Sequence, residues 1–361
     1  MFEASQTDWS AEPLAALPVF SLGGATFTVA DAIRAAHFRG EVAAHAKDLQ
    51  RKMTCHEHAV ANDLVPDAEV LQSMADQFRY SRDLISADDT DIWMHRRGID
   101  EDAFSTHLLR MYWSGELAGK IPAELHASVL PHGDDLVREL ILNGAVSHMA
   151  RKLAWRMAGH RASLRSGDNN VDLIEEAKKQ FFTRTGITGD DLGEWLASHG
   201  GDLIWFQEML SCEAAYAQIA ATVVTEEGLA RALRSRRLEL MQLVVEEIEF
   251  DSLPAAREAV LCIRQDGLSM EEVAHESRFP YFKKEFVLEE LPEDWKVSLL
   301  STPENGLVGP LAADDLFHLF RVLRKVDPDI NDPLIRRRLA DDLVDAYYEE
   351  LCSQEGLKIL I

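Results

Sequence analysis

The sequence predicts a predominantly helical α+β protein, in which a multi-helix body precedes a small domain that contains strands. From about Val29 to Arg234 the apolar residues recur at three- and four-residue spacing, which is typical of amphipathic helices. After Ser235 a run rich in β-branched and large apolar residues, 238–248, predicts the first strand. A long amphipathic helix over 332–352 closes the chain.

Length and helix breaks divide the chain further. At 361 residues it is too long for a single hydrophobic core. Glycine, proline and Asx residues interrupt the helical part at 23–24, 65–66, 119–122, 131–133 and 166–170. Asp67 and Asp190 stand where helix N-caps are expected. We predict an N-terminal extension (1–24), two helical units (25–130 and 131–235), a domain with strands (236–328) and a C-terminal segment (329–361).

The stretch around Trp93 recurs around Trp195. Gln77-Phe78 corresponds to Gln180-Phe181, and after one dropped residue the Asp-Asp, Trp, Gly, Asp, Phe and Leu positions of 88–108 match those of 190–210. From Trp93 to Leu109, five of 17 positions are identical, where roughly one match is expected by chance. Either a three-helix unit is duplicated, or two helix pairs have converged on the same cap, tryptophan and glycine stop.

Composition excludes some classes of partner. The formal net charge of −25 would repel a phosphate backbone, so we expect no nucleic-acid partner. No window approaches 18 consecutive apolar residues, and the start of the sequence lacks a basic and then apolar layout. We therefore expect no membrane insertion and a cytoplasmic location. The four cysteines have no disulfide-framework or CxxC spacing, as in a reducing compartment.

The domain with strands is predicted element by element. A helix over 254–265 stops at Gly267, and a second begins after Ser269, which forms a capping box with Glu272. We then expect a short strand over 286–290, a helix over 293–301, a turn at Gly309-Pro310 and a strand over 316–326.

This order of elements resembles the parvulin fold of proline isomerases. The likeness lies in the helix, glycine and short helix of 256–277, in the turn 305–311, and in the last strand, 315–322, with its His318. The flanking helices are similar to the chaperone part of SurA-type and PpiC-type proteins. The resemblance implies a degenerate parvulin-like domain, a C-terminal helix that packs on the helical body, and a role in holding peptides. Members without a signal peptide are similar to maturation or export helpers for ribosomally made peptides.

The candidate site departs from the family pattern. The resemblance implies two histidines, a Cys or Asp, and an apolar pocket for the proline. His318 is present, but Met241, Gln242 and Leu243 occupy the neighbourhood of the first-strand histidine. We predict that His318 and Gln242 share the hydrogen-bonding role, with five side chains in contact with the substrate: Trp295, Leu299, Phe320, Phe279 and Tyr281.

Structural interpretations of these residues stay open. His318 in a strand is also explained as a half-buried histidine whose ring nitrogens have hydrogen-bond partners, and Trp295 is also explained as a core residue. Phe279, Tyr281 and Phe282 either form a peptide-contacting lip or belong to a loop that tucks its rings inward.

Three functions follow, in order of preference. The first is a chaperone-like protein that binds an unfolded or precursor peptide, for a maturation enzyme or exporter, without a cofactor and with weak or absent isomerase activity. The second is an active peptidyl-prolyl isomerase with a rearranged site around His318. The third is a helical metalloprotein that uses Cys55, His56 and His58, although these neighbours spread around a helix axis instead of sharing one face.

Overall fold

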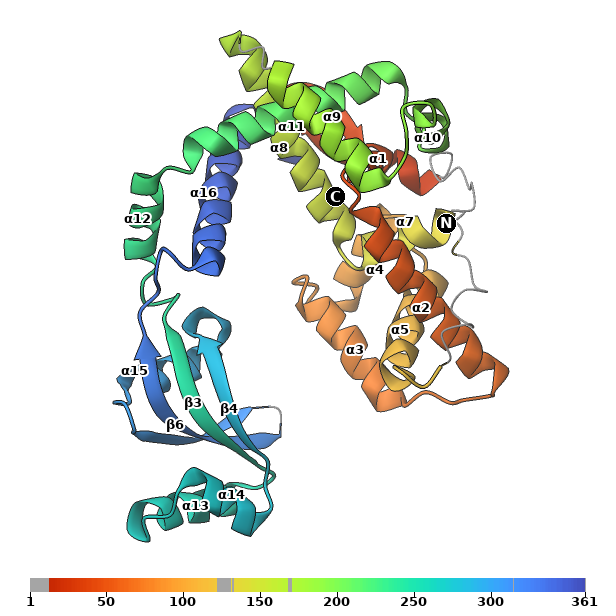
Figure 1. Ribbon diagram of the computed structural model, residues 1–361. Coiled ribbons are helices and arrows are strands. Elements are labelled where there is room, and N and C mark those ends of the chain that lie inside the picture. The colour runs from red at the N-terminus through yellow and green to blue at the C-terminus, as the bar shows by residue number, and fades with distance from the viewer. Residues whose placement is uncertain (1–12, 122–130, 132, 168–170, 314, 361) are drawn as a thin grey trace. The chain divides into compact units, whose positions relative to one another are not determined.

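The computed structural model describes residues 13–121, 131, 133–167, 171–313 and 315–360 (Figure 1). The chain forms two compact units. The helical unit comprises Met1–Ala221 and Ala346–Ile361, and the sheet unit comprises Thr222–Asp345. Mostly helical structure with small antiparallel sheets confirms the predicted α+β class. The first 12 residues, the boundary at 130 and parts of the breaks at 119–122, 131–133 and 166–170 lie outside the described residues.

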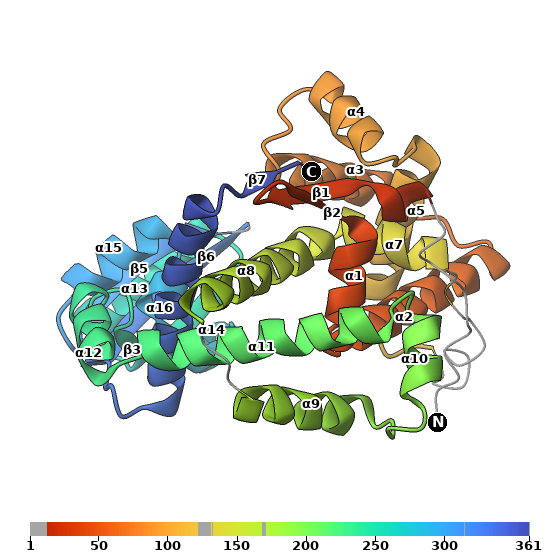
Figure 2. The ribbon, with the colours of Figure 1, turned by 90° about the horizontal axis from the view of Figure 1, so that it is seen from above.

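The helical unit begins with a short 3-10 helix, Pro13–Ala16, and a hairpin. Strand β1 (Pro18–Leu22) pairs antiparallel with β2 (Ala25–Thr28) and with β7 (Lys358–Ile359), as Figure 2 shows. Gly23 and Gly24 form the hairpin turn at positive φ, +55° and +87°, which glycine adopts without strain. The sequence predicted the turn here but not the strands. The helices of this unit are α1 (Val29–Phe38), α2 (Val42–Ala61), α3 (Ala68–Tyr80), α4 (Ala87–Arg96), α5 (Glu101–Glu116), α7 (Gly133–Leu142), α8 (Ala145–Ser166), α9 (Val171–Thr185), α10 (Leu192–Ser198) and α11 (Leu203–Val223).

The sequence repeat has matching ring contacts. In each copy a phenylalanine packs edge-on against the tryptophan, with centroids 5.4 Å apart for Phe78–Trp93 and 5.0 Å for Phe181–Trp195. The same phenylalanine lies 4.9 Å from a second one in both copies, Phe104 in the first and Phe206 in the second. Such edge-to-face pairs have a preferred geometry, so each triad fixes the arrangement of its three helices.

The hydrogen bonds at the starts of α4 and α10 repeat as well. The side chain of Asp89 accepts from the backbone N and hydroxyl of Ser86, and Asp191 accepts from the same two groups of Thr188. The N-cap of α10 is Asp191, so the prediction of Asp190 was wrong by one residue, whereas Asp67 is confirmed as the cap of α3. Matching ring distances together with these matching hydrogen bonds favour duplication over convergence.

Residues 346–361 belong to the helical unit. There Tyr348, at the C-terminal end of α16 (Pro333–Gln354), is fully buried. Its ring lies 5.9 Å from that of Trp155 on α8 and 5.0 Å from that of Tyr216 on α11. Throughout the described ranges, no helix has the length and apolar content needed to span a bilayer.

The sheet unit contains a four-stranded antiparallel sheet in the order β4-β3-β6-β5 (Figure 1). Ile248 and Phe250 of β3 and Leu319 of β6 pack under α13 and α14, whereas Leu243 and Val245 pack on the other side against α15. The sheet therefore has an α13 face and an α15 face. The elements are α12 (Glu226–Ser235), β3 (Gln242–Phe250), α13 (Leu253–Gln265), α14 (Met270–Ser277), β4 (Tyr281–Val287), a 3-10 helix (Leu288–Glu290), α15 (Glu293–Ser301), β5 (Leu307–Ala313), β6 (Leu316–Val326) and the first part of α16.

Several predicted boundaries in this unit need correction. The first strand begins at Gln242, not at 238, and runs to Phe250. The strand expected over 286–290 starts earlier, at Tyr281, and residues 288–290 form a 3-10 helix. The expected turn at Gly309-Pro310 lies inside β5, where the register with β6 shifts. The predicted helix over 293–301 and strand over 316–326 are confirmed.

We predict that Phe181→Ala lowers the free energy of unfolding of the helical unit by about 3–5 kcal/mol, because the ring is fully buried in the second triad. Phe182→Ala is the matched control, since Phe182 is the half-buried neighbour on the same helix. Urea unfolding followed by far-UV circular dichroism measures both. Equal costs for the two variants would show that the triad is not a main packing contact.

Candidate functional site

A buried histidine and glutamate meet on the α15 face of the sheet. Nδ1 of His318, on β6, lies 2.7 Å from Oε1 of Glu247, on β3. In the strand register Glu249 stands opposite His318, and Glu247 stands opposite Phe320. Only 1% of Glu247 and 9% of His318 are exposed. The strands thus bring together two polar side chains that are 71 residues apart in sequence.

Lys284 of β4 completes the cluster. Its Nζ lies 2.6 Å from Oε2 of Glu247 and 3.2 Å from Oε1 of Glu249, and it sits 4.4 Å from the ring centre of Phe282. Burial disfavours the charged ammonium, but hydrogen bonds and attraction from the two carboxylates outweigh burial and raise the pKa of Lys284. Both oxygens of Glu247 therefore have a cationic or hydrogen-bonding neighbour, which is what a buried carboxylate requires.

Strand alternation explains why Glu247 is buried. Successive side chains of a strand point to opposite faces, so Leu243, Val245 and Glu247 share the α15 face. The first two are core residues with no exposed surface. An acidic residue in phase with two core residues must either bring a partner into the core or destabilise the strand.

Aromatic rings cover His318. The ring centre of Trp295, on α15, lies 4.8 Å from that of His318 and 5.0 Å from that of Phe320. The His318 and Phe320 rings are nearly parallel, with 6.0 Å between centres. Because Nδ1 is engaged by Glu247, Nε2 is the ring nitrogen left for any ligand, as acceptor on a neutral ring or as donor on a protonated one.

The same residues include a set of potential metal ligands. Ligating atoms of Glu247, Glu249 and His318 lie within 4.8 Å of one another, and these three form the metal-compatible group found among the described residues. The ammonium of Lys284 already lies between the two carboxylates, so a metal ion would have to displace it. Cys55, His56 and His58 do not form such a group. Cys55 instead packs with Ala59, Trp113 and Ile121 in a core cluster.

The structure does not bring Gln242 to His318. Gln242 pairs with Val326, at the other end of β3, and the alternation of side chains puts it on the α13 face. Trp295, Leu299 and Phe320 lie together near His318, but as core residues that are 8%, 0% and 0% exposed.

Phe279 and Tyr281 lie on the face away from His318. The ring of Phe279 packs 4.9 Å from that of Phe250, beside α13 and α14. The hydroxyl of Tyr281 donates to Glu246 at 2.7 Å. Of the three aromatics in this stretch, Phe282 is the one on the α15 face, and it is 37% exposed.

Sequence reasoning missed Glu247, Glu249 and Lys284. The signal for Glu247 was present, since a strand that begins at Gln242 puts this acid in phase with Leu243 and Val245. The signal for Lys284 was not, because the aromatic residues before it predict a lip or a loop, whereas 281–287 form the edge strand β4.

The fold and site define an α+β protein with a buried histidine–carboxylate–lysine cluster on a four-stranded antiparallel sheet. No family model matches the chain, and no curated protein matches its sequence. Among solved structures, the chain is similar to a peptidylprolyl isomerase, PrsA, from Bacillus cereus (13% identity, 63% of this chain and 88% of that one, TM-score 0.39). It is also similar to the foldase protein PrsA from Streptococcus pneumoniae (12% identity, 63% and 90%, TM-score 0.27).

A third similar structure is described as one of the SurA-like chaperones PEB4 and Cj1289 of Campylobacter jejuni (10% identity, 61% of this chain and 88% of that one, TM-score 0.21). At such identities and TM-scores these likenesses carry no information about substrate or activity.

We predict that Lys284→Met lowers the free energy of unfolding of the sheet unit by about 1–3 kcal/mol at neutral pH. The substitution leaves Glu247 buried with His318 as its remaining partner. Lys283→Met is the matched control, since Lys283 is an exposed neighbour on the same strand without an ion pair among the described residues. Urea titration measures both, and an equal loss in the two variants would contradict a special role for Lys284.

The pH dependence gives a second readout of the same contact. A lysine whose pKa is raised on folding stabilises the protein below its unfolded pKa of about 10.4, and this contribution is lost as pH rises through the folded pKa. The difference between wild type and Lys284→Met should therefore be constant from neutral pH to about 9 and shrink above about 10.5. A difference that shrinks already below pH 8 would be inconsistent with the ion pair.

Proposed function

We propose that the protein is a chaperone-like peptide-binding protein whose sheet unit has weak or no proline isomerase activity. The observation that carries this proposal is the closed state of the cluster around His318. The imidazole is bound to a buried carboxylate, covered by Trp295 and only 9% exposed. It is held as a structural element of the sheet.

Proline isomerisation needs more room than this cluster offers. The barrier to rotation about the peptide bond is about 18–20 kcal/mol, and an enzyme lowers it by holding the proline in an apolar pocket while it stabilises the twisted amide. The apolar side chains next to His318 pack on one another in one core cluster, in which Trp295, Leu299 and Phe320 are buried. On the first strand, the side chain beside His318 is a glutamate, not the histidine that the family resemblance implies.

The helical unit supplies surface for holding peptides. The connection from α2 to α3 exposes four large apolar side chains within 11 residues: Val60, Leu64, Val65 and Val70. Val65 is 86% exposed. Large apolar side chains left exposed within one short segment are candidates for a surface that binds a partner. With a net charge of −25, the protein favours basic or neutral clients.

The finer parts of the proposal rest on the family resemblance. In these finer parts, the client is an unfolded or precursor peptide. The protein holds it in the cytoplasm for a maturation enzyme or an exporter. A second candidate function is an active isomerase in which Nε2 of His318 contacts the substrate. Its support is the bond from Nδ1 to Glu247, which orients the ring.

We predict that catalytic amounts of the protein do not accelerate cis/trans exchange in a short proline-containing peptide, because the ring of His318 is covered. Two-dimensional exchange NMR measures this rate directly. Exchange cross-peaks that need the protein, disappear with His318→Ala and survive in His275→Ala would establish the isomerase instead. His275 is an exposed histidine on α14 and serves as the matched control.

We predict that the double variant Val60→Ser and Val65→Ser suppresses aggregation of a chemically denatured model protein several-fold less well than the wild type, because it removes exposed apolar contact area. Light scattering measures the suppression. Val297→Ser is the control, since Val297 is 65% exposed on α15. Unchanged suppression by the double variant would exclude this surface as the peptide-binding site.

A further inference from the structure

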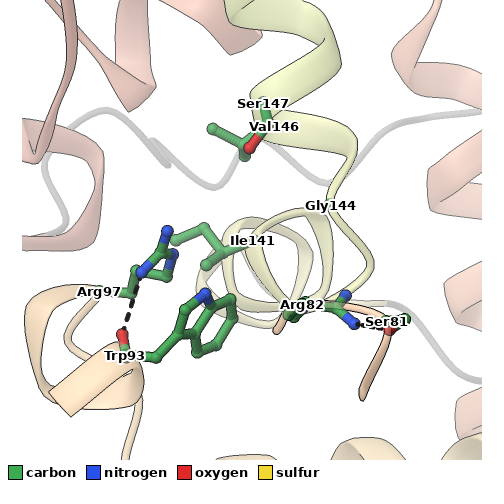
Figure 3. A pocket seen from close by; sticks show the side chains of 8 residues that line it. All are labelled: Ser81, Arg82, Trp93, Arg97, Ile141, Gly144, Val146 and Ser147. Atoms are coloured by element: carbon green, nitrogen blue, oxygen red, sulfur yellow. Dashed lines mark hydrogen bonds between the residues drawn. The ribbon is translucent and has the colours of Figure 1, made fainter. Parts of the chain in front are cut away.

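A cavity of about 490 Å³ lies in the helical unit between the end of α3, α4 and the junction of α7 with α8. Two arginines, Arg82 and Arg97, line it together with Trp93, Ile141, Val146 and Ser147 (Figure 3). Its wall therefore combines cationic groups with apolar ones.

Neither arginine has an anionic partner. Arg97 donates to the carbonyl oxygen of Trp93 at 3.2 Å and lies 4.2 Å over the ring of that residue. Arg82 donates to the carbonyl oxygens of Leu142 and Phe78, at 2.6 and 3.2 Å. Among the residues that the structure describes, no carboxylate lies within ion-pair distance of either guanidinium.

The two guanidinium cations also repel each other. Burial lowers the pKa of both guanidinium groups, and the charge of Arg82 lowers the pKa of Arg97 further. Arginine nevertheless stays charged in proteins. Two half-buried like charges therefore carry an electrostatic cost that an anion between them would offset.

The duplicated helices show that packing does not require this pair. In the second copy His199 stands in place of Arg97, and its ring stacks on Trp195 at 4.2 Å. Counted from Phe78 and Phe181, Thr185 stands in place of Arg82, and the adjacent Arg184 donates to the carbonyl oxygen of Phe38. The aromatic triad is the same in both copies, so the triad forms without an arginine at either of these positions.

The α8 end of the cavity adds to the positive potential. Gly144, at φ +80°, precedes the first turn of α8, where Val146 and Ser147 line the cavity. Backbone N–H groups of a first helical turn favour an anion, although that of Ala145 already donates to Oδ1 of Asn143 at 2.9 Å.

We propose that this cavity binds an organic carboxylate with an apolar group, such as the C-terminal residue of a peptide. The planar guanidinium groups of Arg82 and Arg97 pair with the carboxylate oxygens. The apolar group of the ligand packs on Ile141 and Val146, both buried core residues whose surface toward the cavity is apolar. The site belongs to the helical unit and does not depend on the proposed function of the sheet unit.

Trp93 provides a direct probe, because its ring lies under Arg97 in the cavity wall. Titration of 15N-labelled protein with N-acetyl-leucine should shift one of the indole N–H signals of the seven tryptophans saturably. The signal is identified by its loss in Trp93→Phe. N-acetyl-leucinamide, which lacks the carboxylate, should leave it in place.

Arg97→Gln should weaken the binding of N-acetyl-leucine by about tenfold or more, since a charge-assisted hydrogen bond is lost. Arg96→Gln is the matched control, because it makes the same change in charge at the exposed adjacent residue. Unchanged positions of the other indole signals show that both variants are folded. Failure of the Trp93 signal to move, an equal response to the amide, or an equal effect of the two substitutions would each overturn the proposal, as would equally tight binding of inorganic phosphate.

Discussion

An edge-to-face contact between a phenylalanine and a tryptophan organises the helical unit. The contact appears twice, as Phe78–Trp93 and Phe181–Trp195, and a second phenylalanine extends it in each copy. Rings packed in this way leave little freedom in the angle and depth at which helices cross. Because the same triad occurs in both copies, the residues around it are free to differ. The first copy has an arginine beside its tryptophan, and the second has a histidine.

In the sheet unit the corresponding constraint is the burial of one carboxylate. Glu247 occupies a core position, so its surroundings must supply compensation from two other strands: His318 from β6 and Lys284 from β4. The same contacts reduce the chemical options of His318, since its Nδ1 is occupied and its ring is covered by Trp295. A buried cluster of this kind favours one strand register, because a slip of one residue would remove Leu243 from its core cluster and leave buried charges without partners.

The sequence predicted the elements that carry their own local signals. The capping box of Ser269 and Glu272 precedes α14, and Pro254 stands in the first turn of α13. The first part of β4, 281–285, was missed because two adjacent lysines at the sheet edge look like loop residues, and only Lys284 has its partner across the sheet. The hairpin β1–β2 escaped for a similar reason, since part of its pairing is with residues 358–359 at the far end of the chain. Local sequence signals such as caps and apolar spacing predict helices, whereas contacts between distant segments determine sheets.

The candidate sites differ in how much of each could be predicted from the sequence. His318 was predicted through a family pattern, but its partner Glu247 emerges only when the strand register is known. The arginine cavity has no sequence motif, because Arg82, Arg97 and Ile141 converge from three helical segments. A carboxylate in the sheet that already has a lysine partner indicates a structural cluster, whereas two arginines whose hydrogen-bond acceptors are all neutral carry charges that an anion would offset. By that criterion the helical unit, not the sheet unit, offers the more favourable place for an anionic ligand.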